Sequence, residues 1–175
     1  MGKTTVSIEL STSDIKSLRD MIGRYAQSLN DRCSRLMERL GEIGTRTASD
    51  GFSGAQYDGV NDVSVSFERV ADDSIRVVAN GDAVAFIEFG AGITMGGGHP
   101  SAGVLGFGPG TYPGNGHWDN PKGWAYHGSP GSNGVWVRDD VYRTLGNPPA
   151  MAMANATEEM VRQVVSIAME VFDGW

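Results

Sequence analysis

One long apolar seam near the N-terminus constrains the fold more than any other feature. Nine apolar side chains recur at spacings of three or four, which places them on one face of an α-helix of about eight turns. They are Ile15, Leu18, Ile22, Tyr25, Leu29, Cys33, Leu36, Leu40 and Ile43. The polar cluster 11–14 can cap the start of this helix, and Gly41 and Gly44 predict that its end frays. In a chain of 175 residues, either a sheet and a second helix cover the seam or a neighbouring molecule does.

Alternating apolar and polar residues after this helix are typical of half-buried strands. Segments 63–68 and 75–79 have this pattern and enclose a turn, and the Asn80-Gly81 pair predicts a second tight turn. Together with 83–89, they predict a meander of three antiparallel strands.

Two further short strands and a final helix complete the predicted elements. The strands are 6–10 and 135–141, and a cap at Asn147, followed by two prolines, predicts the helix. Its apolar stripe comprises Met153, Met160, Val161, Val164, Val165, Ala168, Met169 and Phe172. The predicted fold class is therefore α+β, with the long N-terminal helix and the C-terminal helix packed on a small antiparallel β-sheet. The length of the chain suits a single domain over 1–175.

A glycine-rich excursion over 90–134 separates the sheet from the last helix and holds 15 of the 25 glycines. Glycine loses more conformational entropy on ordering than any other residue, so this segment needs anchors. Burial of its few large aromatic side chains against the rest of the same chain does not offset that loss of entropy. The sequence therefore predicts an extended docking loop that partner surfaces order. The expected subunit or partner interface comprises Glu88, Phe89, Tyr112, Trp118, Trp124, Tyr126 and Trp136.

Few residues are candidates for chemistry. His99, His117 and His127, with Asp119 and Glu88, lack both an i,i+4 ligand pair and a metalloprotease motif, so structural roles are favoured. Glu88 is either an exposed strand carboxylate or a partner of an arginine or of backbone amides across an interface, and the residues leave these two interpretations equal. We expect no catalytic, metal or cofactor site.

The composition narrows the class of partner. A net charge of −7 argues against a surface that grips nucleic acid. Cys33 is the only cysteine, which excludes an intrachain disulfide and indicates a reducing compartment. No stretch approaches the ~20 apolar residues that a membrane-spanning helix needs. These observations favour a soluble protein whose partners are other proteins.

The order of the motifs resembles the siphophage neck and tail-completion family, whose members are also described as minor tail or head–tail joining proteins. The most specific pieces are EFGAG at 88–92, the tryptophan-bearing segment 118–126, and Pro-Ala-Met at 149–151, where the last helix opens. The resemblance covers nearly the whole chain. Departures are Ala125, where relatives often carry a second tryptophan, and a longer 131–143.

This resemblance implies a non-enzymatic virion protein that is assembled in the cytoplasm of a host bacterium. The chain would form a ring, commonly a hexamer, between head-closure or connector proteins and tail terminator or tail tube proteins. Genomic DNA would pass through the lumen, and an acidic chain suits a lumen that does not grip phosphates.

Two other function classes stay open. Exposed tryptophans at 118, 124 and 136 could stack on sugar rings, which predicts a carbohydrate- or cell-surface-binding module. A hydrolase that uses His117, His127 and Asp119 is the third reading.

Overall fold

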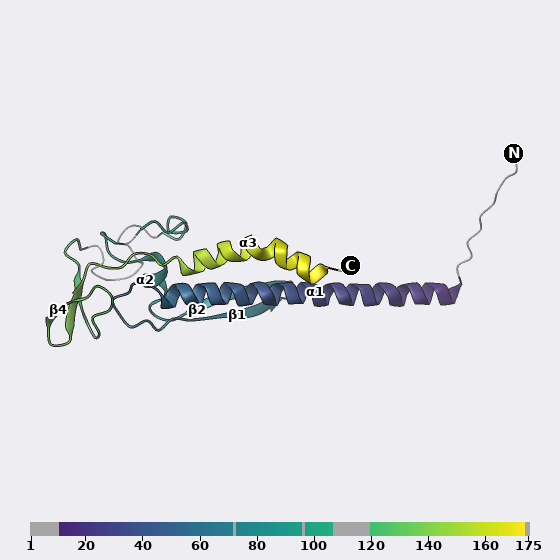
Figure 1. Cartoon of the computed structure of the whole chain (residues 1–175), viewed down its shortest axis with the longest axis horizontal. Coiled ribbons are helices and arrows are strands. Elements are labelled where there is room, and N and C mark those ends of the chain that lie inside the picture. The colour runs from purple at the N-terminus through teal and green to yellow at the C-terminus, as the bar shows by residue number, and fades with distance from the viewer. Residues whose placement is uncertain (1–10, 72, 96, 107–119, 174–175) are drawn as a thin grey trace, which may run out of the picture.

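Helix α1 (Thr12–Ser53) is the longest element of the computed structural model, which describes residues 11–71, 73–95, 97–106 and 120–173 (Figure 1). Ser11 caps it as predicted, since the Ser11 hydroxyl accepts a hydrogen bond from the Asp14 amide and the Asp14 carboxylate accepts one from the Ser11 amide. The strand expected over 6–10 lies outside the described residues. The helix has 42 residues, so its N-terminal half projects beyond every other labelled element in Figure 1.

The predicted end of this helix near Gly44 was wrong, because both glycines in that region are packing positions inside the helix. A Cβ at Gly44 would lie 2.7 Å from Sδ of Met160 and 2.9 Å from Val77. A Cβ at Gly41 would lie 2.7 Å from the Phe67 ring. Glycine here lets a helix and a strand approach α1 closely, and α1 continues to Ser53.

The predicted C-terminal helix is confirmed as α3 (Ala152–Phe172), which lies along the C-terminal half of α1 (Figure 1). Arg32 Nη1 donates to the carbonyl of Val171 over 2.7 Å, at the negative end of the α3 dipole. Arg39 pairs with Glu170 at 2.6 Å. These contacts mark the side of α1 that faces α3.

The hairpin of β1 (Ser64–Ala71) and β2 (Ser74–Asn80) is also confirmed, and it packs on α1 across from α3 (Figure 1). The third strand of the predicted meander is wrong, because its residues form helix α2 (Val84–Phe89). The carboxylate of Asp62 accepts hydrogen bonds from the amides of Asp82 and Ala83, at 2.8 and 2.9 Å. This contact turns the chain after β2 and starts the helix.

A second antiparallel sheet has the strand order β3-β5-β4. Its strands are β3 (Trp124–His127), β4 (Val135–Arg138) and β5 (Val141–Thr144). The single strand predicted over 135–141 is therefore a hairpin, which turns at Asp139 with a φ of 43°. The described residues thus have an α+β fold with two small sheets.

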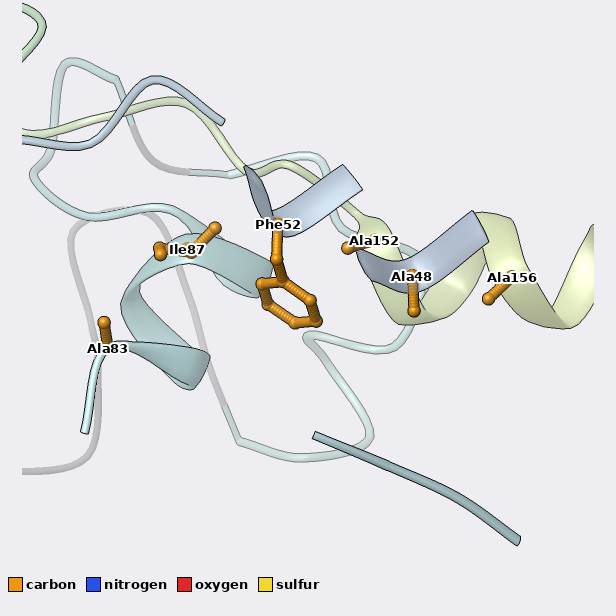
Figure 2. Packing of buried hydrophobic residues seen from close by; sticks show 6 residues of the cluster. All are labelled: Ala48, Phe52, Ala83, Ile87, Ala152 and Ala156. Atoms are coloured by element: carbon orange, nitrogen blue, oxygen red, sulfur yellow. The ribbon is translucent and has the colours of Figure 1, made fainter. Parts of the chain in front are cut away.

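The buried core is small and lies where α1, α2 and α3 meet. Figure 2 shows its six members, which are Ala48, Phe52, Ala83, Ile87, Ala152 and Ala156. Phe52 and Ile87 are its largest fully buried side chains. Alanine elsewhere in the cluster allows the helices to approach closely, and this junction fixes the start of α3.

Candidate assembly surface

A buried ionisable pair joins α2 to the start of α3. One oxygen of Glu88 accepts hydrogen bonds from His99 Nε2 at 2.9 Å and from the Ala154 amide at 3.1 Å. The other oxygen accepts from the Met153 amide at 2.9 Å. A carboxylate at this position neutralises the positive end of the α3 dipole and satisfies amides that have no partner within the helix. The predicted cap at Asn147 is wrong: its side-chain amide donates instead to the carbonyl of Phe86.

Both ring nitrogens of His99 are occupied. Its Nδ1 accepts a hydrogen bond from the Ser101 amide at 3.1 Å, so the ring proton lies on Nε2 and points to Glu88. The Phe89 ring lies over the imidazole, with 4.3 Å between ring centroids. A general base needs a free ring nitrogen, so this geometry gives His99 a structural role.

The structure corrects the interface role expected for Glu88. Its side chain is about 5% exposed and binds backbone amides of its own chain. Of the two interpretations that the residues left equal, the exposed carboxylate is wrong, and the backbone amides that Glu88 binds belong to α3 of the same chain. Phe89 is half-buried against His99.

Three of the other predicted interface residues, Trp124, Tyr126 and Trp136, lie in the second sheet. Trp124 and Tyr126 are half-buried in β3, and the Tyr126 hydroxyl donates to the carbonyl of Pro130 at 2.7 Å. Partial burial and the nearby Asp58 carboxylate raise the pKa of Tyr126. Trp136 in β4 is 63% exposed. Tyr112 and Trp118 lie outside the described residues.

The described ends of the glycine-rich segment are anchored to the chain itself. Ala91 and Asn147 exchange backbone hydrogen bonds at 2.9 and 3.1 Å. At the other end, Asp58 accepts hydrogen bonds from the Thr144 hydroxyl and the Asn133 amide. The docking loop expected over 90–134 therefore includes strand β3 and two fixed ends, and residues 107–119 lie outside the described part.

The largest group of exposed apolar side chains on one element lies on the projecting half of α1. All residues from 12 to 27 are exposed, and Ile15 and Ile22 keep 56% and 58% of their side-chain surface in solvent. The exposed apolar residues on this half are Ile15, Leu18, Met21, Ile22 and Tyr25. Four of them belong to the predicted seam, so the seam has a covered half and an exposed half. We call the exposed seam residues Ile15, Leu18, Ile22 and Tyr25 the α1 stripe.

Helix α3 has an exposed apolar face of its own. Val161, Val165 and Met169 follow one another at i,i+4 spacing and are each more than 60% exposed. We call these three residues the α3 stripe. The sequence predicted the apolar breadth of this helix but assigned no surface role to it. The sequence did contain evidence for such a surface, because an apolar stripe too broad for one packing element to cover indicates a second packing partner.

The remaining candidates for chemistry are His127, His117 and Asp119, and the structure describes the first of them. His127 pairs with Asp140 at 3.2 Å on an exposed surface, while His117 and Asp119 lie outside the described residues. Among the described residues, no group of three or more His, Cys, Asp or Glu side chains is placed to hold a metal ion. Within the same residues, every helix falls short of the length or the apolar character needed to cross a membrane. Comparison of the chain with models of protein families, with curated proteins and with solved structures finds no match.

Proposed function

We propose that the chain is a structural, non-enzymatic virion protein of a tailed bacteriophage, which forms an oligomeric ring in the neck or tail-completion region. The observation that carries this proposal is the α1 stripe on a helix that projects from the body of the molecule. A contiguous exposed apolar surface of this kind marks a site of protein association. The resemblance of the motif order supplies the type of assembly.

The distribution of charge supports a passage for DNA. The chain has a net charge of −7, and half of its 14 basic residues lie on α1. The residues outside α1 are therefore strongly acidic, and such surfaces do not grip phosphates. A ring whose lumen is lined by these residues lets DNA pass without specific binding.

Size-exclusion chromatography with light scattering tests self-assembly. We expect the wild-type protein to form an oligomer whose population rises with concentration. The double variant Leu18→Asp with Ile22→Asp, which puts two charges into the α1 stripe, becomes monomeric because burying unpaired carboxylates is unfavourable. Since both positions are exposed in the monomer, its melting temperature stays close to that of the wild type at dilutions where both proteins are monomeric.

The matched control is Ser17→Asp with Gln27→Asp. It adds the same charge to exposed positions of the same helix that lie outside the α1 stripe, so the oligomer stays intact. A wild-type protein that stays monomeric at all concentrations, and that is absent from purified phage particles, contradicts the proposed function.

Carbohydrate binding is the second candidate, and the exposed Trp136 is the observation that favours it. Trp136 belongs to the edge strand β4, where its sequence neighbours Val135 and Val137 are also exposed. Quenching of tryptophan fluorescence by glycans, abolished by Trp136→Ala, would support this function. An unchanged spectrum across a glycan panel leaves the structural role as the better account.

A further inference from the structure

We infer that the α1 stripe of one copy packs on the α3 stripe of the next copy, so that each subunit uses two different surfaces. This inference rests on the proposed self-assembly and names the contact that produces it. Its occupant is a second copy of this chain, and three observations select that occupant.

The first observation is continuity with a contact that already exists inside the chain. Ile15, Ile22, Leu29, Leu36 and Ile43 follow one another at intervals of seven residues, and the last three belong to the half of α1 on which α3 packs. On the adjacent row, Leu18 and Tyr25 precede Arg32 and Arg39, whose side chains bind the end of α3. An ideal helix drifts only about 20° per heptad from this repeat. The α1 stripe therefore extends, beyond the end of α3, the same face that α3 covers.

The second observation is a match in length. Residues 15–25 rise about 15 Å along the helix axis, and residues 161–169 rise about 12 Å. Side chains at these spacings form ridges that interdigitate with the ridges of a facing helix. The α3 stripe of the neighbouring copy can therefore pack on the α1 stripe, on the same face of α1 that the chain's own α3 covers further along the helix.

The third observation concerns charge. Helix α1 carries seven basic and six acidic residues, whereas α3 carries three acidic residues and one basic residue. The inferred contact therefore brings a helix with a small positive balance against one with a negative balance, as complementary surfaces require.

Pairing of α1 with α1 is the competing arrangement. It is isologous, stops at a dimer, and leaves the α3 stripe in solvent. The heterologous contact covers both apolar stripes and repeats from copy to copy, which is the type of contact that builds a closed ring. The described surfaces therefore favour the contact between α1 and α3.

Cross-linking between single-cysteine chains tests the contact. Cys33 is the only native cysteine, so Cys33→Ala gives a background without thiols. One chain then carries Leu18→Cys and the other carries Val165→Cys, with a removable tag on one of them so that mixed dimers differ in mass from like pairs. A short bismaleimide joins the thiols after the chains have been mixed and assembled.

We expect the mixed dimer as the main cross-linked species, and its loss when Lys16→Cys, on the opposite, exposed face of α1, replaces Leu18→Cys. Putting both cysteines in one chain should extend the product to a ladder. Two outcomes would overturn the inferred contact without contradicting self-assembly. In the first, the main product joins two chains that both carry Leu18→Cys. In the second, chromatography shows an oligomer but no mixed dimer is cross-linked. A protein that is monomeric and yields no cross-link in any mixture overturns both.

Discussion

Glu88 joins three segments of the chain, which are α2, the segment around His99 and the start of α3. Its carboxylate binds the imidazole of His99 and two amides in the first turn of α3. Its backbone carbonyl also accepts a hydrogen bond from the Met151 amide at 3.2 Å. One side chain therefore sets where α3 starts and holds the His99 segment against it.

We expect Glu88→Ala to lower the free energy of unfolding by about 3 to 5 kcal/mol, because it leaves a buried imidazole N–H and two amides without an acceptor. Urea unfolding followed by circular dichroism measures this loss. Glu158→Ala removes an exposed carboxylate from α3 and should change stability by less than about 0.5 kcal/mol. Equal effects of the two variants would contradict the role assigned to Glu88.

Asp62 gives a prediction about pH. Hydrogen bonds from the Ala83 amide, and then from the Asp82 amide, lower the pKa of this carboxyl below the ordinary 3.8. A depressed pKa in the folded state stabilises the fold above the unfolded pKa, and this contribution is lost as the pH falls through the folded value. The melting temperature of the wild type should therefore exceed that of Asp62→Ala by a constant difference near neutral pH. This difference should become smaller below pH 3.8. A difference that widens in acid would contradict this assignment.

Among the elements, two glycines of α1 provide a matched comparison. A Cβ at Gly51 would lie 2.8 Å from Cβ and 3.0 Å from Cα of Ala152, whereas a Cβ at Gly23 meets nothing within 4 Å. We expect Gly51→Ala to destabilise the protein by about 1 to 3 kcal/mol through overpacking against α3. Gly23→Ala should increase helicity, since alanine favours a helix by about 1 kcal/mol over glycine. Thermal melts followed by far-ultraviolet circular dichroism measure both, and the same sign of change in the two variants would refute this account.

The elements that sequence could predict are those whose signals are local. The capping box of α1, the alternation in β1 and β2, and the apolar stripe of α3 each lie within one segment. Helix α2 was missed because a segment of six residues, five of them apolar, suits a strand or a helix, and the deciding contact comes from Asp62. The burial of Glu88 likewise depends on amides 65 and 66 residues later in the chain. The spacing of apolar residues in a helix is also the same whether other elements cover them or leave them exposed, so the exposed half of α1 could not be predicted from sequence.

The molecule as a whole has two unlike ends. At one end lie the core and both sheets, and at the other α1 continues past every other described element, with exposed apolar side chains on one face (Figure 1). An isolated helix of about 15 residues is marginally stable in water, because tertiary packing supplies most of the stability of helices in proteins. A second copy that covers the α1 stripe would therefore stabilise the helix as well as the assembly.

This coupling makes hydrogen exchange along α1 depend on protein concentration. In dilute, monomeric samples, amides of residues 15–27 should exchange rapidly, whereas those of residues 40–52, which α3 and the β1–β2 hairpin cover, should stay protected. At concentrations where the oligomer forms, protection of residues 15–27 should rise by about tenfold or more, because opening then requires dissociation. The variant Leu18→Asp with Ile22→Asp should lose this dependence and keep the protection of residues 40–52. Strong protection of residues 15–27 in a sample that light scattering shows to be monomeric would mean that the projecting helix is stable without a partner.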